Sequence, residues 1–491
     1  RVAGLRRRRR RHALAALAAG RRRRKRRQAA ATAPTGGEGS AKRRRCSVQE
    51  GPEAPPVAAA ARAPLPKSKF WDLEEGLGPR EVAALRAARV GGPADPRPSC
   101  PAEEVCRAAA LEDLRQTFSK LCAAHGVKVG VSTVFFDKWH CAWLQRAGKE
   151  ALGAGLLAPS EPLLPMLEGG ASAFLGLEDA LVRALAFADA VKVRAVAADL
   201  GKAASRVAAA LPKKMRKLEH RGHLQMHEDR EGKSITLSYG GTDVRVAPGH
   251  LQKLRALYRG EGGEAGLLDA AFCCLLRYQC MLRKGFQGAC TAAVFTAIRE
   301  AFGARFECFA SPLNCRYPAM CSAFPDTDGV FGSLGSFFAI SPRSGSFQLN
   351  PPFVDDVISA MVERLDVLLQ AADERKDALT FVVVVCANEG SRSGSVALSV
   401  LRASGFCRAQ VVCPKQRHCY LDGDQHSSEE TRLSPCDTAV YLLQSACGHA
   451  EIPATEERMQ RVLASFQPEG PALPVDGAQR KRAAGQGETK K

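Results

Sequence analysis

Residues Ser346–Phe353 read Ser-Phe-Gln-Leu-Asn-Pro-Pro-Phe, and this stretch decides how the rest of the chain is interpreted. Its first half, Ser346–Leu349, has the character of a short buried strand, and a long helical pattern starts at Val354. A polar turn between a strand and a helix is typical of the edge of an α/β sheet where ligands bind. The two prolines stiffen that turn and donate no hydrogen bond of their own.

The turn suits an aromatic amine as its ligand. An exocyclic adenine amine is a poor nucleophile because its lone pair is delocalised into the ring. The Asn350 side-chain oxygen and the Pro351 carbonyl can hold both amine hydrogens, and Phe353 can stack on the base. Transfer of a methyl group from a sulfonium needs positioning more than acid or base catalysis. We therefore predict adenine-N6 methylation, with catalytic residues Asn350, Pro351, Pro352 and Phe353; the alternative is a rigid strand exit without chemistry.

The surrounding sequence predicts an α/β sheet. Short apolar segments separated by turns predict strands at Arg305–Ala310, Ser346–Leu349, Thr380–Cys386, Ala409–Cys413 and Thr438–Leu443. Helical patterns lie at His250–Tyr258, Leu267–Met281, Val354–Gln370 and Ser395–Ala403. A hairpin is predicted from Ser234–Tyr239 and Asp243–Val246 around Gly240-Gly241. This alternation predicts a methyltransferase domain over residues 234–450 with ligands at the carboxyl ends of its strands.

Candidate cofactor residues follow the first predicted strand. No Gly-x-Gly-x-x-Gly follows that strand, but S-adenosylmethionine has no phosphate to cradle, and the turn Ser311–Asn314 can serve instead. An acidic residue about 20 positions on, Asp326 or Asp328, is expected at the cofactor ribose. The proposed cofactor residues are Ser311, Pro312, Asn314, Asp326, Gly332 and Ser333. Only 35 residues separate Ala310 from Ser346, so we expect truncated crossovers and a reduced sheet.

The N-terminal half predicts a basic leader followed by helices. Residues 1–66 are of low complexity and are expected to be disordered, as is the tail 468–491. Helices are predicted at Glu103–Ala124 and Leu177–Leu211 within a helical domain spanning residues 100–230, with Pro212 as a stop. Behind it, Lys213, Lys214 and Arg216 form either a solvated face or a strip that contacts RNA phosphates.

The net charge of +20 resides at the two ends of the chain. Residues 1–50 contain 18 Lys/Arg and 2 Asp/Glu, residues 480–491 contain 5 and 1, and the stretch between contains 48 of each. The basic runs suit nuclear import or loose attachment to phosphates; the alternative is an Arg-rich coding bias in a disordered leader. The 18 cysteines include no Cys-x-x-Cys pair, so we expect buried thiols and no metal site. No segment has 18 uninterrupted apolar residues, which predicts a soluble protein without a membrane partner.

Three blocks resemble a known family: Phe306–Cys315 (FECFASPLNC), Cys321–Gly335 (CSAFPDTDGVFGSLG) and Ser344–Phe353 (SGSFQLNPPF). They are similar to the phosphorylated-CTD-interacting-factor family, the cap-specific adenosine-N6 methyltransferases. The resemblance implies a Rossmann-like, S-adenosyl-L-methionine-dependent domain with an N-terminal helical domain. It also implies a capped mRNA substrate whose first nucleotide, 2′-O-methyladenosine, becomes N6,2′-O-dimethyladenosine in the nucleus. By the same resemblance, Asp355 lies near the substrate.

Animal members of that family carry a WW module that binds the phosphorylated tail of RNA polymerase II. Trp71, Trp139 and Trp143 are the only tryptophans, and none has the spacing of such a module. We therefore expect no WW module and no polymerase partner. Two other functions stay open: N6 methylation of internal RNA or DNA, and a catalytically silent RNA-binding scaffold.

Overall fold

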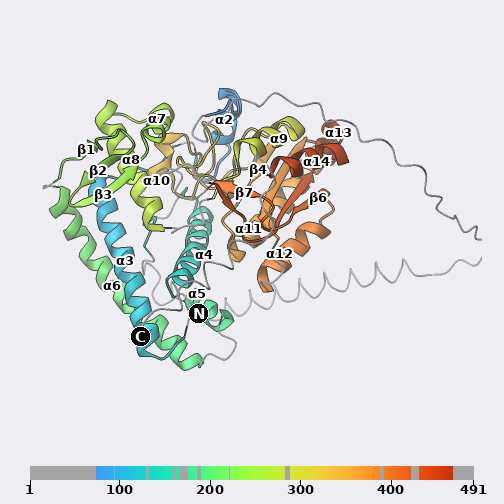
Figure 1. The fold of residues 1–491 in the computed structure, drawn as a ribbon. Helices are drawn as coiled ribbons and strands as arrows, with labels where there is room; N and C mark the ends of the chain where they lie inside the picture. Colours follow the sequence, from blue (N-terminus) through green and yellow to red (C-terminus); the bar gives the residue numbers. More distant parts are fainter. Residues whose placement is uncertain are drawn as a thin grey trace, which may run out of the picture. The chain divides into compact units, whose positions relative to one another are not determined.

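The computed structural model describes residues 73–92, 94–128, 132–157, 161–164, 175–184, 189–219, 222–281, 288–387, 392–421 and 431–467. All of them belong to one compact unit, residues 66–491 (Figure 1). The predicted leader 1–66 and tail 468–491 lie outside the described residues.

A four-stranded mixed sheet forms the centre of the α/β part. Its strands are β4 (Gly345–Leu349), β5 (Leu379–Cys386), β6 (Cys407–Cys413) and β9 (Thr438–Gln444), in the order β4-β5-β9-β6. β4 and β5 are parallel, whereas β9 is antiparallel to both β5 and β6. Because β5 and β9 are apolar at almost every position, they are covered on both faces, which confirms the predicted α/β class.

Three single-residue parallel bridges continue this sheet beyond β4. Glu307 pairs with Gln348 of β4, Met320 pairs with Glu307, and Ser333 pairs with Met320. Successive bridging residues are 13 positions apart, close to the minimum length of a parallel crossover. Little chain is left for strands, so the strand predicted at Arg305–Ala310 is wrong and only Glu307 pairs. The expected reduced sheet is confirmed.

Helices cover both faces of the sheet. One face packs against α11 (Asp355–Arg375) and α12 (Arg392–Ala403), together with Leu85 of α2 (Pro79–Ala87). The other face packs against α9 (Ala292–Phe302) and α14 (Glu456–Ser465). The remaining short elements are α10 (Pro325–Asp328), η2 (Gly329–Phe331), η3 (Phe337–Ala339), β7 (Cys419–Leu421), β8 (Thr431–Leu433) and α13 (Ala446–Glu451).

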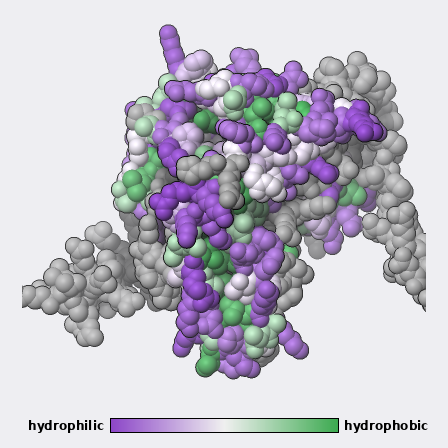
Figure 2. All heavy atoms as spheres, turned by 90° about the vertical axis from the view of Figure 1, so that its left-hand side faces the viewer, coloured by the Kyte–Doolittle hydropathy of each residue, from purple (hydrophilic) through white to green (hydrophobic). Residues whose placement is uncertain are grey.

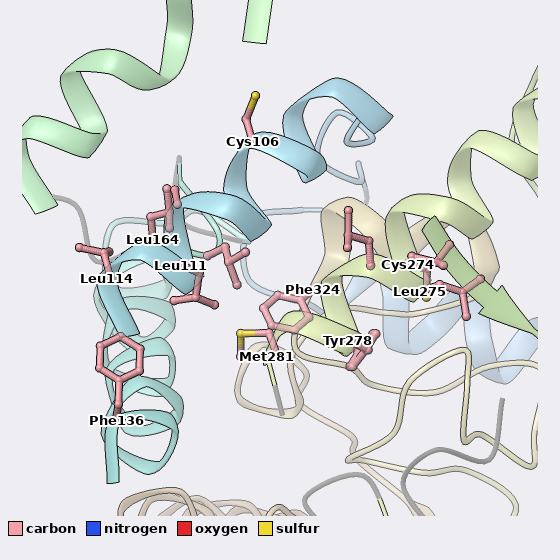
Figure 3. Packing of buried hydrophobic residues seen from close by; sticks show 14 of the residues in the cluster. Cys106, Leu111, Leu114, Phe136, Leu164, Cys274, Leu275, Tyr278, Met281 and Phe324 are labelled. Carbon is pink, nitrogen blue, oxygen red and sulfur yellow. The ribbon is translucent and has the colours of Figure 1, made fainter. Parts of the chain in front are cut away.

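A second hydrophobic core joins the helices of the N-terminal half to the segment that follows them. Its elements are α3 (Pro101–Ala124), α4 (Ser132–Gly153), α5 (Leu175–Ala184), α6 (Ala190–Glu219), β2 (Ile235–Tyr239), β3 (Thr242–Val246), α7 (Pro248–Leu257) and α8 (Gly263–Met281). We call it the helical core. β1 (Gln225–Glu228) pairs with β2 at its edge. In Figure 3, Phe324 lies close to Met281 and Tyr278 of α8, so the α/β part contributes to this core as well.

Two local predictions have opposite outcomes. The β2–β3 hairpin is confirmed, and both turn glycines have positive φ, +59° at Gly240 and +81° at Gly241, as the tightest hairpin turns require. The single helix predicted at 177–211 is instead α5 and α6, and α6 runs through Pro212 to Glu219. Packing of α6 along α3, with Leu211 buried, outweighs the local cost of the proline.

A buried ion cluster ties α3, α8 and α10 together. The Arg277 guanidinium is fully buried and contacts Glu104 at 2.6 Å and Asp326 at 2.8 Å. Arg107 contacts the same Glu104 and also Glu161. Burial alone would disfavour the charged Glu104, but Arg277 and Arg107 outweigh it and lower its pKa to about 2.

The described cysteines agree with the expectation of buried thiols. Every described cysteine is a free thiol, and most are buried. Among the described residues, no helix has both the length and the apolar character to cross a membrane. Figure 2 shows a face that is mostly hydrophilic, with small separate hydrophobic areas.

Replacing Arg277 should test the ion cluster. Arg277→Met leaves the buried Glu104 and the partly buried Asp326 short of their shared partner, so we expect the free energy of unfolding to fall by about 3–5 kcal/mol. Urea denaturation followed by circular dichroism measures this loss. As control, Arg255→Met breaks an exposed pair with Glu264 and should change the stability by less than about 1 kcal/mol. Equal effects of the two substitutions would contradict a structural role for the cluster.

Candidate active site

A cavity of about 550 Å³ opens at the carboxyl ends of β4 and of the bridging segments. That volume suits a cofactor or a nucleotide. Turns of the α/β part provide Cys308–Ser311, Asn314, Ser322–Pro325, Ser336–Phe338 and Asn350–Phe353. The other walls come from Cys141, Leu144, Gln145, Gly148, Lys149 and Leu152 of α4, from Tyr278 and Met281 of α8, and from Tyr420, Leu421 and Arg432–Cys436 at β7 and β8.

The sheet explains where this cavity lies. From Glu307 the chain crosses to Met320 on one side, whereas β4 and then β5 lie on the other side. The crevice between Glu307 and β4 is therefore the place where the strand order reverses. Ligands of α/β sheets bind at the carboxyl ends of strands at such a point.

The turn Asn350–Phe353 leads from β4 toward α11. Pro351 is buried, while Asn350 and Phe353 are partly buried and line the cavity. The Val354 N–H donates to the Pro352 carbonyl at 2.7 Å. Among the described residues, neither the Asn350 side chain nor the Pro351 carbonyl has a hydrogen-bond partner. Both acceptors are therefore available to a ligand.

The turn Ser311–Asn314 forms the neighbouring wall and is internally bonded. The Ser311 N–H donates to the Asn314 side-chain oxygen at 2.7 Å, and the Asn314 and Cys315 N–H groups donate to the Ser311 carbonyl at 3.1 and 2.9 Å. From outside the turn, Lys253 of α7 donates to the carbonyls of Cys315, at 2.7 Å, and Leu313. Burial lowers the pKa of Lys253.

Aromatic rings cover the part of the cavity between these turns and η3. Phe309 lies 5.3 Å from Phe337 and 6.0 Å from Phe338, measured between ring centroids. Phe324 meets Tyr278 edge to face at 5.5 Å, and the Arg277 guanidinium lies 4.9 Å from the Phe324 ring centre. The ion cluster thus holds one of the cavity-lining rings in place.

Only part of the predicted cofactor set is brought together. Ser311 and Asn314 line the cavity, whereas Pro312, Asp326, Gly332 and Ser333 are not among the described lining residues. Asp326 is held by Arg277, and Asp328 accepts a hydrogen bond from the Tyr278 hydroxyl at 2.6 Å. Ser333 supports the wall indirectly, because its hydroxyl bonds to that of Ser322 at 2.7 Å.

The remaining predicted residues lie outside the described lining. At Gly332, with φ of +100°, a Cβ would come 2.2 Å from the Pro318 carbonyl oxygen, so this glycine permits close backbone packing. Asp355 is partly buried in the first turn of α11. Lys213, Lys214 and Arg216 are exposed on the last turns of α6.

The structure adds α4 to the site, which the sequence did not indicate. Its lining positions 141, 144, 145, 148, 149 and 152 recur at helical spacing and form one face. Among the described lining residues the charged ones are Lys149 and Arg432, and both are basic. This electrostatic balance favours an anionic ligand such as a nucleotide.

The described residues contain no metal site. No group of three or more His, Cys, Asp or Glu side chains is arranged to hold an ion there. His418 bonds to the Pro414 carbonyl and the Thr438 hydroxyl, both at 2.8 Å, so its two nitrogens are already engaged. His426, eight residues further along the chain, lies outside the described residues.

Comparison with known proteins gives matches over this region. Residues 253–423 match the family described as the phosphorylated CTD interacting factor 1 WW domain. The human and mouse proteins named mRNA (2′-O-methyladenosine-N(6)-)-methyltransferase are each 36% identical over 260 residues. That match covers 50% of this chain and 36% of each relative, so the chain spans about a third of the length of these relatives.

The family match corrects one prediction. We expected no WW module, but the matching family is described as a WW domain, so that expectation is wrong and the case against a polymerase partner no longer stands. The matched residues include none of the three tryptophans. They run from α7 to β7 and include β4, β5 and the two turns Ser311–Asn314 and Asn350–Phe353, whereas the α4 wall and residues 432–436 of the cavity lie outside the match.

Removing the Lys253 contact should loosen the Ser311–Asn314 turn. In Lys253→Met the carbonyls of Leu313 and Cys315 lose their buried donor, so we expect the amides of Asn314 and Cys315 to exchange hydrogen about tenfold faster. Hydrogen exchange with mass spectrometry measures this. The exposed Lys202→Met serves as control. An unchanged exchange rate would show that Lys253 does not hold the turn.

Proposed function

We propose that this chain carries the catalytic part of an mRNA cap methyltransferase, because residues 253–423 match the phosphorylated CTD interacting factor 1 family model and the chain resembles two methyltransferases of that kind. It transfers a methyl group from S-adenosylmethionine to N6 of the cap-adjacent 2′-O-methyladenosine, giving N6,2′-O-dimethyladenosine. One observation carries the proposal: Asn350–Phe353 leaves β4 at the switch point of the sheet and lines a cavity of nucleotide size.

The strand order supports a Rossmann-like methyltransferase fold. Counting the bridging residues as strands, the order across the sheet is Ser333, Met320, Glu307, β4, β5, β9 and β6. This is the 3-2-1-4-5 order of a doubly wound sheet, with the antiparallel β9 inserted before β6. Such a sheet places a cofactor over the ends of its first two strands.

The residues at that position fit S-adenosylmethionine, which supplies the methyl group when bound. Ser311 and Asn314 follow the first bridging segment, and Ser322 follows the second. The rings of Phe309, Phe324 and Phe337 provide an apolar surface for the cofactor's adenine. Asp326 is held by Arg277 and is not among the described lining residues, whereas Ser322 lines the cavity, so Ser322 is the candidate nearer the cofactor ribose.

The target adenosine is positioned from the other side. The Asn350 side-chain oxygen and the Pro351 carbonyl accept from the N6 amine, and Phe353 stacks on the base. Lys149 and Arg432 supply positive charge for the phosphates next to that nucleotide. Asp355 and the α6 residues Lys213, Lys214 and Arg216 are candidates for more distant RNA contacts. A substrate of this kind, together with the basic terminal runs, fits a nuclear protein.

Methylation of a defined RNA tests the function. An oligonucleotide beginning with a 7-methylguanosine cap and 2′-O-methyladenosine is incubated with S-adenosylmethionine, and its nucleosides are measured by mass spectrometry. We expect N6,2′-O-dimethyladenosine from the wild type. Asn350→Ala should lower the rate about 100-fold or more, because one half of the acceptor pair is lost. Gln370→Ala, exposed on α11, should keep full activity.

The same assay separates the alternatives. Equal methylation of capped and uncapped RNA would favour an enzyme acting on internal adenines. Absence of any N6-methyl product, together with no cofactor binding by calorimetry, would favour a silent RNA-binding scaffold. If Asn350→Ala matched the wild type, the proposed acceptor role would be overturned.

A bulky residue on α4 should block the cavity without unfolding the protein. Gly148 lines the cavity, and a Cβ there meets no atom within 4 Å. We expect Gly148→Trp to lower the methylation rate roughly tenfold or more through misplaced substrate, with an unchanged melting temperature. Gly153→Trp is the matched control, because it lies on the same helix, also has free space and is not among the described lining residues. Equal activity of both variants would place the reaction elsewhere.

A further inference from the structure

A second and much smaller cavity lies directly beside Asn350. Its space is about 10 Å³, which is the room that one water molecule needs. Four polar residues line it: Glu307, Asn314, Gln348 and Asn350. Asn314, Asn350 and Phe309 line the large cavity as well, so the two cavities share a wall.

Strand pairing places the polar groups on one face of the sheet. Glu307 pairs with Gln348, and the backbone bonds on either side are short: Cys308 N–H to the Gln348 carbonyl at 2.8 Å and Gln348 N–H to the Phe306 carbonyl at 2.9 Å. Asn350 is two residues beyond Gln348, so it continues along the same face. Neighbouring strands lie about 4.8 Å apart, and two residues along a strand span about 6.6 Å. At these spacings one water can bridge the side chains of Glu307 and Asn350.

Buried polar atoms point to a bound water. The Gln348 side-chain oxygen is buried and has no hydrogen-bond partner, although a buried polar atom normally has one. Glu307 is also buried, and its Oε2 accepts from the N–H groups of Arg316 at 2.7 Å and Tyr317 at 3.3 Å. Both of these bonds end on the same oxygen. Among the described residues, no hydrogen-bond donor reaches the other oxygen, Oε1, so it can accept a hydrogen bond from a water.

The proposed reaction needs an acceptor for a proton. When N6 attacks the sulfonium methyl group, the nitrogen becomes cationic and must lose one hydrogen as a proton. The Asn350 amide and the Pro351 carbonyl accept hydrogen bonds but are too weakly basic to keep a proton. Among the described residues of the large cavity the charged groups are Lys149 and Arg432, and neither is a base when protonated.

We propose that the small cavity holds one water, and that this water carries the proton from N6 to the carboxylate of Glu307. This inference rests on the proposed function. The N6–carbon bond forms as the carbon–sulfur bond breaks, and the electron pair of the broken bond stays on sulfur, which becomes a neutral thioether. The N6–H electron pair returns to nitrogen, the proton goes to the water, and the water passes a proton to Glu307. Product release then allows the carboxyl group to lose the proton to solvent.

The surroundings of Glu307 suit this role. Burial raises its pKa to about 7, although the N–H groups of Arg316 and Tyr317 and the charge of Lys253 oppose the rise. A carboxyl group with this pKa can take up and release a proton near neutrality. The titratable groups near it are Lys253 from α7, Cys290 before α9, the adjacent Cys308, and Cys315, Arg316 and Tyr317 from the turn that follows Glu307.

The pH dependence of Glu307→Gln tests the inference. The variant keeps an oxygen for the two N–H donors, so the fold should persist, and circular dichroism verifies this. In the wild type, kcat should rise with pH through a midpoint near 7, since the carboxyl group must be deprotonated to accept the proton. In Glu307→Gln we expect kcat to be roughly 10- to 100-fold lower, with that midpoint lost and both KM values unchanged.

Two further variants make the result decisive. Gln348→Met fills similar space but removes the oxygen that holds the water, and should lower kcat without changing KM. Glu363→Gln, exposed on α11, should leave the pH profile as in the wild type. An active wild type with the same pH profile in Glu307→Gln would overturn the relay. An inactive wild type would overturn the proposed function instead.

Discussion

The pairing of Gln348 with Glu307 is the constraint on which the site depends. This one parallel bridge joins the shortened first segment of the sheet to β4. It therefore brings the turn Ser311–Asn314 next to the turn Asn350–Phe353, and the two turns form adjacent walls of one cavity. A shift of register by one residue would turn Gln348 and Asn350 to the opposite face, because side chains alternate along a strand.

The elements that the sequence predicted well are those whose formation is determined by the pattern of residues within the element itself. β4, β5, β9 and α11 lie close to their predicted ranges, since a buried apolar run or an amphipathic period is written directly in the sequence. Pro212 shows the limit of that approach. Its local cost is real, but packing of α6 along α3 decides the outcome, and no pattern within α6 reports on α3.

The site was harder to predict because its walls come from distant parts of the chain. Asp326 has the spacing of a ribose-binding carboxylate, yet Arg277, 49 residues earlier, engages it. Likewise, α4 reads as an ordinary scaffold helix, and only the packing of Cys141 and Ala142 near Val354 and Val357 shows that it closes the cavity. The residues predicted from the turn itself, Asn350, Pro351, Pro352 and Phe353, do line the cavity because a strand exit fixes them locally.

The helical core has a consequence for how the chain can be divided. It contains residues of α3 and α6 as well as β2, β3, α7, α8 and Phe324, so its apolar surface is shared by both sides of the sequence position 234. A fragment starting there would carry one half of an interior without its complement, and would expose it to water. Such a truncated polypeptide should aggregate rather than behave as an autonomous catalytic module, which argues for keeping the residues from α3 onward in any shortened version.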